Sequence, residues 1–160
     1  MFDKFGEFDS WKEMNEAAEG QLQEGDFEAI RELAMENGID LGDAEDYLEG
    51  FAEGFVTPVM AAHGKLKIEA EALKPQEIME DWINYIRVRC LEDEKMALAV
   101  RRKGKTLKGC IAELLKWSFK NMYPVDKDIT KAAGVTQSVK LGIPGSGRAK
   151  QIITEYYLGK

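Results

Sequence analysis

The sequence predicts a mainly α-helical protein, a compact multi-helix bundle with an acidic N-terminal helical subdomain and a short extended or turn segment near residues 135–147. Apolar residues recur at helical spacing along nearly the whole chain, and most of these stretches begin at a Ser, Thr or Asp that can cap a helix. Residues 1–53 hold 17 Asp and Glu against 3 Lys and Arg, a balance of −14. Residues 82–160 hold 7 against 16, a balance of +9.

Three short amphipathic helices are expected in the acidic part. Ser10 and Glu13 have the spacing of a capping box, which predicts the first helix. Asp26 is a suitable N-cap for the second helix, and Asn37-Gly38 supplies its left-handed stop. A third helix is expected to start near Asp43, with an apolar stripe of Ala44, Tyr47, Leu48, Phe51 and Phe55.

The rest of the chain predicts longer helices. Thr57-Pro58 is typical of an N-cap and first helical position, and this helix extends to Leu73 although Gly64 weakens it. Further helices are expected around 78–90, from Asp93, from the cap Thr106, from the cap Asp126 to Gly134, and from about Arg148 to Leu158. The helix after Thr106 has an apolar stripe predicted to be buried: Leu107, Cys110, Ile111, Leu114, Leu115, Ser118 and Phe119.

The totals fit a single soluble globular chain. A length of 160 residues with 44% hydrophobic content can bury a sizeable core. We divide it into an acidic subdomain at 1–56 and a helical core domain at 57–160, which could also form one continuous domain. No apolar run has the length of a membrane helix, and the acidic start is unlike a signal peptide. With only two cysteines, we expect a cytoplasmic protein of a bacterial host cell.

Two charged surfaces are the candidate binding sites. The first is an acidic surface on the outward faces of the second and third helices, made of Glu28, Glu32, Glu36, Asp43, Asp46, Glu49 and Glu53. It could mimic a nucleic acid, or it could be an ordinary solvated helical face. The second is a basic patch made of Arg101, Arg102, Lys103, Lys105, Lys108, Arg148 and Lys150. These cations could contact phosphates, an acidic partner, or the acidic half of the same chain.

No arrangement typical of a catalytic or metal centre stands out. His63 is the only histidine, so no histidine-rich zinc site is expected, and Cys90 and Cys110 lack a CxxC spacing. The loop Gly142–Arg148 lacks the Gly-Lys-Ser/Thr of a phosphate-binding loop, so we interpret it as a turn. We therefore expect no enzyme, no cofactor and no metal.

Short segments of the second half resemble the PcfK-like family of mobile-element proteins over about residues 80–158. The resembling segments are Asp81-Trp82-Ile83-Asn84-Tyr85-Ile86, Glu92-Asp93-Glu94-Lys95-Met96-Ala97, Lys103-Gly104-Lys105-Thr106-Leu107-Lys108-Gly109-Cys110-Ile111 and Ile153-Thr154-Glu155-Tyr156-Tyr157. They correspond to the family's acidic DE-x-x-A helix start, its Lys-Ser/Thr-x-x-Gly-Cys helix and its closing aromatic pair. The chain departs from the family at Glu155, where a His is usual, in lacking an acidic tail, and in an insertion at Val139–Gly147.

The resemblance implies a protein of a phage or conjugative element. Some relatives are anti-CRISPR proteins that inhibit the type II RNA-guided DNA nuclease, so a CRISPR effector nuclease or its guide complex is the expected partner. The acidic surface would then act as a nucleic-acid mimic in the positively charged channel of that nuclease. Two alternatives stay open: a nucleic-acid-binding accessory protein that uses the basic patch, and a non-enzymatic protein-interaction adaptor.

Overall fold

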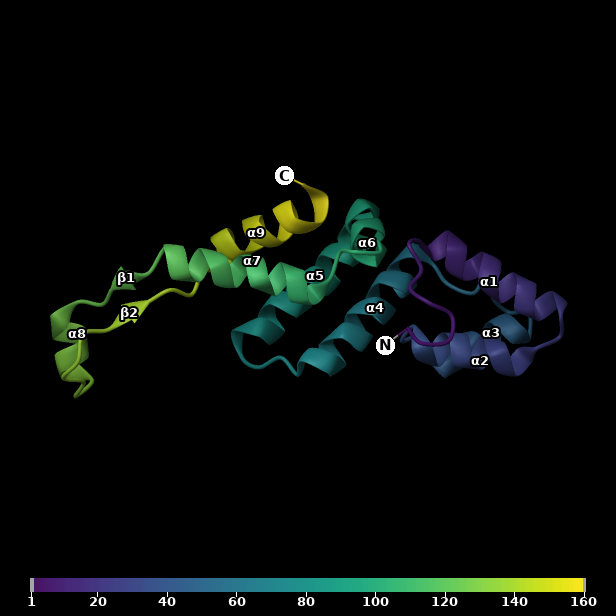
Figure 1. The fold of residues 1–160 in the computed structure, drawn as a ribbon, viewed down its shortest axis with the longest axis horizontal. Helices are drawn as coiled ribbons and strands as arrows, with labels where there is room; N and C mark the ends of the chain where they lie inside the picture. The colour runs from purple at the N-terminus through teal and green to yellow at the C-terminus, as the bar shows by residue number, and fades with distance from the viewer. Residues whose placement is uncertain (1, 160) are drawn as a thin grey trace.

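The computed structural model describes residues 2–159, and within this range it is built almost entirely of helices (Figure 1). This confirms the predicted mainly helical bundle. Each of the predicted N-cap side chains accepts a hydrogen bond from a backbone amide in the first turn of its helix. These caps are Ser10, Asp26, Thr57, Asp93, Thr106 and Asp126.

The acidic N-terminal part forms a three-helix unit at one end of the molecule (Figure 1). Its helices are α1 (Trp11–Gln23), α2 (Phe27–Glu36) and α3 (Leu41–Leu48). Their apolar faces enclose a core of Met14, Ala18, Ile30, Leu33, Ala34, Ile39, Ala44, Tyr47, Phe55, Val56 and Ala61.

The start and the apolar stripe of the third helix differ from the prediction. Asp40 caps α3 by accepting a bond from the amide of Gly42, so the helix begins before Asp43. It ends at Leu48 because the chain turns at Gly50, which has a φ of 84°. Phe51 therefore lies outside the helix and is 78% exposed, whereas Phe55 is buried from the following loop.

A second core lies among the C-terminal helices and is built around α4 (Pro58–Leu73), α5 (Ile78–Glu92), α6 (Glu94–Arg101), α7 (Leu107–Lys120) and α9 (Ser146–Leu158). Its fully buried side chains include Leu66, Ile83, Met96, Leu107 and Ile153. The two cores meet in α4, where Ala61 belongs to the first core and its neighbour Ala62 belongs to the second.

A narrow arm extends from the C-terminal core at the end opposite to α1–α3 (Figure 1). It consists of β1 (Tyr123–Pro124), α8 (Lys127–Ala132) and β2 (Lys140–Leu141). The strands pair antiparallel, with Tyr123 opposite Leu141 and Pro124 opposite Lys140. The segment expected to be extended or a turn near residues 135–147 thus supplies β2, and α9 begins at Ser146 slightly before the predicted start.

Candidate functional site

Four members of the acidic surface lie on or just after α3 and face solvent. Asp43 and Asp46 lie on the helix, Glu49 is its C-cap, and Glu53 follows in the loop to α4. All four side chains are exposed, and none forms an ion pair with another described residue. This part of the surface therefore presents uncompensated negative charge.

The other three members of the acidic surface are engaged within the chain. Glu28 forms an ion pair with Arg31 at 3.1 Å, and Glu32 forms one with Lys4. The Glu36 carboxylate accepts bonds from the backbone amides of Lys4 and Phe5, at 3.1 and 3.3 Å. Glu28 pairs within α2, whereas Glu32 and Glu36 bind the N-terminal segment. The separation of about 30 residues explains why the sequence pattern did not reveal the contacts to Glu32 and Glu36.

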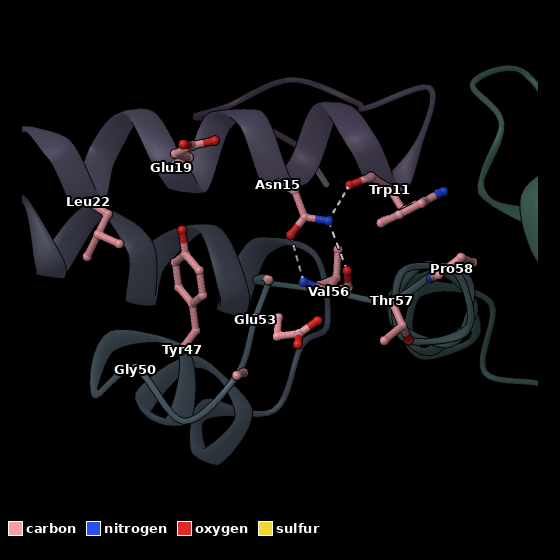
Figure 2. A pocket seen from close by; sticks show the side chains of 12 residues that line it. Trp11, Asn15, Glu19, Leu22, Tyr47, Gly50, Glu53, Val56, Thr57 and Pro58 are labelled. Atoms are coloured by element: carbon pink, nitrogen blue, oxygen red, sulfur yellow. Dashed lines mark hydrogen bonds between the residues drawn. The ribbon is translucent and has the colours of Figure 1, made fainter.

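An open cleft of about 740 Å³ lies between α1 and the connection from α3 to α4 (Figure 2). Asn15 joins its two walls. Its side-chain amide donates to the carbonyl of Val56 at 2.9 Å, and its side-chain oxygen accepts from the Val56 amide at 3.0 Å. Two aromatic residues, Trp11 and Tyr47, and two acidic residues, Glu19 and Glu53, also line the cleft.

Tyr47 is the least exposed polar side chain of this cleft, at 9%. Its ring packs edge-on against Phe55 with 5.7 Å between the ring centres, and Figure 2 shows its hydroxyl directed toward α1. Burial raises the pKa of Tyr47, and the nearby negative charge of Glu19 raises it further. The hydroxyl forms no hydrogen bond with any residue from 2 to 159.

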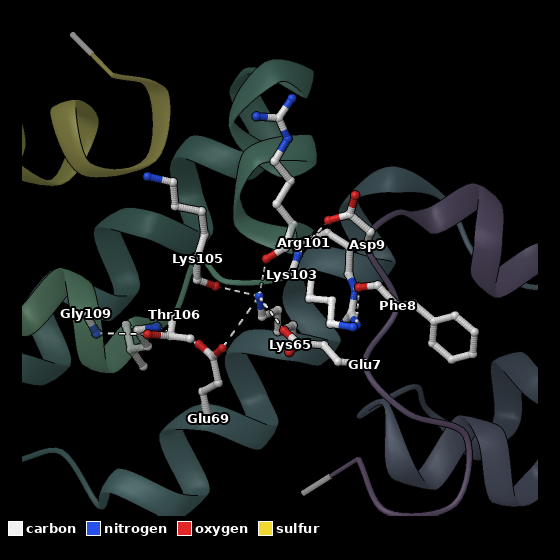
Figure 3. Close-up of polar contacts among 12 residues, drawn as sticks. Glu7, Phe8, Asp9, Lys65, Glu69, Arg101, Lys103, Lys105, Thr106 and Gly109 are labelled. Carbon is white, nitrogen blue, oxygen red and sulfur yellow. Dashed lines mark hydrogen bonds and ion pairs between the residues drawn. The ribbon is translucent and has the colours of Figure 1, made fainter.

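A buried polar cluster links the N-terminal segment to the C-terminal core (Figure 3). The Lys65 side chain is fully buried and donates to the carbonyls of Arg102 and Lys105 at 2.6 and 2.5 Å. Its ammonium also lies 3.2 Å from a Glu7 oxygen and 3.8 Å from a Glu69 oxygen. Burial lowers the pKa of Lys65, an effect that both carboxylates oppose.

Glu69 and Arg101 complete the buried polar cluster. Glu69 accepts a bond from the amide of Leu107 at 2.8 Å, and burial raises its pKa. The Arg101 guanidinium donates to the carbonyl of Phe8 at 2.9 and 3.2 Å, and the Asp9 carboxylate accepts from the amide of Lys103. Because Lys65, Glu69 and Arg101 are all buried and already bonded to backbone groups of the same chain, we interpret this cluster as structural.

The basic patch is consequently smaller than the sequence indicates. Arg101 is only 1% exposed, so its guanidinium is not presented at the surface. Lys105 donates to the carbonyl of Tyr156 at 2.8 Å and lies over that residue's ring. Arg102, Lys103 and Lys108 have exposed side chains that form no ion pair within the described part of the chain.

Arg148 and Lys150 lie on α9, and each is placed over an aromatic ring of another helix, Trp117 and Tyr85 respectively. Arg148 stacks over Trp117 near the end of α7, whereas Lys105 precedes the start of that helix at Leu107. Ten residues separate Leu107 from Trp117, about 15 Å at the rise of an α-helix. The structure therefore divides the predicted basic patch into two groups.

The apolar stripe of α7 is also only partly buried. Leu115 is 56% exposed and Phe119 is 68% exposed, which corrects the prediction that both are buried. They line a groove of about 420 Å³ between α5, α7 and the base of the arm, together with Ile78, Met79, Trp82, Ile111, Ser118, Met122, Gly142 and Ile143.

Comparisons with models of protein families, with curated proteins and with solved structures found no match to this chain. Among residues 2–159, no three His, Cys, Asp or Glu side chains are grouped in a way that could hold a metal ion. No helix in that range combines the length and apolar character needed to cross a membrane.

Proposed function

We propose that this chain acts by binding, and that its acidic surface occupies a basic, nucleic-acid-binding groove of a partner protein. The observation that carries the proposal is the group of exposed, unpaired carboxylates on and after α3. A rigid surface of one charge sign competes with phosphates for the same cations, and its binding weakens as salt rises. This role requires no catalytic group on the chain.

The resemblance to PcfK-like proteins supplies the partner in this proposal, a type II RNA-guided DNA nuclease. Such a nuclease holds its heteroduplex in a positively charged channel and reads a short DNA motif with arginines. The protein would then be an anti-CRISPR inhibitor from a phage or another mobile genetic element. The N-terminal unit is the part that would enter the channel, because Asp43, Asp46, Glu49 and Glu53 are found there.

A second candidate function is nucleic-acid binding by the basic patch, as in an accessory protein of a conjugative element. It is favoured by the exposed and unpaired side chains of Arg102, Lys103 and Lys108 in one short segment. Contacts from these cations to phosphates would make affinity fall steeply with salt.

The test is a cleavage assay with purified nuclease, guide and target DNA, run with and without the protein. The double variant Asp46→Lys/Glu49→Lys reverses two carboxylates of the acidic surface. The matched control Glu16→Lys/Glu24→Lys reverses two exposed acids outside that surface, one on α1 and the other its C-cap. Both doubles change the formal net charge from −7 to −3. We expect the first double to weaken inhibition on the order of tenfold or more, and the control to inhibit like the parent chain.

Three results would contradict the proposal. Equal losses for both doubles would mean that total charge, not this surface, determines inhibition. Full inhibition by Asp46→Lys/Glu49→Lys would exclude charge mimicry at this surface. Unaffected cleavage, together with a salt-sensitive gel shift of free DNA that is lost in Arg102→Ala/Lys108→Ala, would instead establish the second candidate function.

A further inference from the structure

We propose that the cleft between α1 and the α3–α4 connection is a receptor for an arginine side chain of the partner. This inference rests on the proposed function and deepens it, because it names the chemical group that the N-terminal unit receives. The cleft is independent of the buried polar cluster and of the basic patch, since it shares no lining residue with either.

The walls of the cleft combine negative charge with aromatic surface. Glu19 lies on the α1 wall and Glu53 on the opposite connection, as Figure 2 shows. Both side chains are exposed, and neither forms an ion pair with another residue between 2 and 159. Trp11 at one end is half-buried and offers a ring on which a cation or its aliphatic stem can rest.

The Tyr47 hydroxyl points independently to a ligand. The Tyr47 residue is nine-tenths buried, while its hydroxyl reaches the open cleft and is accessible there. The hydroxyl has no hydrogen-bond partner among the described residues, although it lines the cleft and is directed toward the α1 wall that carries Glu19 (Figure 2). The hydroxyl and the Glu19 carboxylate could together accept hydrogen bonds from N–H groups of a ligand in the cleft.

The cleft is preformed, which lowers the cost of binding. Asn15 spans it with two bonds to the backbone of Val56 and a third to the carbonyl of Trp11 at 3.1 Å. These bonds fix the separation of the walls before any ligand arrives. Binding to a fixed site avoids the loss of side-chain and loop freedom that a mobile site would incur.

The arrangement favours guanidinium over ammonium. A guanidinium is planar and has five N–H donors, so it can bond to a carboxylate and a hydroxyl while its face stacks on an indole. An ammonium is a compact, strongly hydrated charge that does not stack in this way. We therefore expect an arginine peptide to bind more tightly than its lysine counterpart.

The experiment is a titration of the full chain, followed by NMR, with the capped peptide Gly-Arg-Gly and with Gly-Lys-Gly at constant ionic strength. The chain has three tryptophans, of which only Trp11 lines the cleft, so the indole N–H signals of Trp82 and Trp117 serve as internal references. The expected result is a saturable shift of the Trp11 signal and of the Val56 amide with the arginine peptide, and weaker binding of the lysine peptide.

Two variants test the assigned groups. Tyr47→Phe removes only the unpaired hydroxyl, so we expect unchanged thermal stability and about tenfold weaker arginine-peptide binding, as for a lost bond to a charged donor. Glu19→Gln/Glu53→Gln should abolish measurable binding. The control Glu16→Gln/Glu24→Gln changes the net charge equally and should bind like the parent chain.

The proposal is overturned if the peptide shifts scatter over the whole acidic surface, if the lysine peptide binds equally, or if the control double loses as much affinity as the cleft double. The peptide titration does not involve the nuclease, so it separates this inference from the proposed function. Inhibition that depends on Asp46 and Glu49 but not on Tyr47 would contradict this inference and leave the proposed function standing. Binding of the arginine peptide without inhibition of the nuclease would contradict only the proposed function.

Discussion

The backbones of Gly38 and Gly64 are in direct contact where the turn after α2 meets α4. A β-carbon at Gly38 would lie 2.3 Å from the Gly64 carbonyl oxygen, and one at Gly64 would lie 2.2 Å from the Asn37 carbonyl oxygen. Gly38 also has a φ of 69°, which L side chains rarely adopt. Gly64, which the sequence marks only as a weak point of a helix, therefore allows the N-terminal unit to approach α4.

Replacing Gly64 tests this contact. Helix propensity alone predicts that Gly64→Ala stabilises the chain by about 1 kcal/mol. We expect the opposite, a loss of about 1–3 kcal/mol in the free energy of unfolding, because the backbone of Asn37 must move. Urea denaturation measures the change. Gly20→Ala on α1 is the control, since its β-carbon meets nothing within 4 Å, and it should stabilise.

Lys65→Met should destabilise the protein by about 3–5 kcal/mol, because it leaves the buried Glu69 carboxylate and two backbone carbonyls without their cation. The defect should shrink as pH falls, because Lys65 lowers the pKa of Glu69 in the parent chain and its loss raises that pKa further, so protonation removes the uncompensated charge from the variant first. The folded pKa of Glu69 is raised above its ordinary value of 4.5, so the folded state holds this proton more tightly than the unfolded state. Stability from this group is present below pH 4.5 and declines as pH rises through the folded pKa. Denaturation of both proteins across this range provides the measurement, and a defect that grew toward acid would contradict the assignment.

Asn15→Ala should lower the free energy of unfolding by about 2–4 kcal/mol, since the amide and carbonyl of Val56 both lose their partner. Hydrogen exchange at the Val56 amide should accelerate more than exchange at amides of the C-terminal core. Lys12→Ala, at an exposed position of the same helix, is the control and should leave that exchange unchanged. Unaltered protection of Val56 in Asn15→Ala would mean that the side chain does not fix the cleft.

Both cysteines should be inert in the folded protein. Burial raises the pKa of Cys90 and of Cys110 from 9.0 to about 12, so neither thiol forms the reactive thiolate near neutral pH. We expect negligible reaction with Ellman's reagent at about pH 8, and full reaction of two thiols in denaturant. Rapid labelling of the native chain would show that one thiol is accessible.

The same thiols should destabilise the fold in alkali. Their pKa is raised in the folded state, so their contribution is complete below pH 9.0 and declines as pH rises toward about 12. Between pH 9 and 10 the loss should be about 1 kcal/mol per thiol. The variant Cys90→Ala/Cys110→Ala should lose this part of the alkaline slope in a series of urea denaturations, and an unchanged slope would assign it to other groups.

The helices were predictable because their signals are local. A cap such as Thr106 and the first amides of its helix lie within three residues, so spacing alone identifies the start. Asp40 was missed as the cap of α3 because Asp43 offers the same side chain three residues later. Such ambiguity shifts a boundary but does not change the fold.

The sites were less predictable because they depend on contacts between distant residues. In the sequence Lys65 and Arg101 look like surface cations. In the fold both are buried, and they donate hydrogen bonds to carbonyls 37 and 93 residues away. The cleft depends on the bonds between Asn15 and Val56, 41 residues apart. Phe119 is exposed because the chain leaves the core as the arm just beyond Lys120. The spacing of apolar residues in the sequence does not indicate where that happens. For the acidic surface the sequence predicted the charge but not which carboxylates are free. Glu32 and Glu36 are bonded to Lys4 and Phe5 of the distant N-terminal segment.

The helix α4 contributes Ala61 to one core and Ala62 to the other, so it joins the N-terminal unit to the C-terminal core. Because the excess negative charge lies at the end that carries α1–α3 and the excess positive charge at the other, the protein has a permanent electric dipole along its long axis. If the partner is basic, as the proposed function requires, its field would turn this dipole while the two molecules are still apart. The N-terminal helices would then reach the partner first, so fewer encounters would have the wrong orientation, and added salt would remove this advantage.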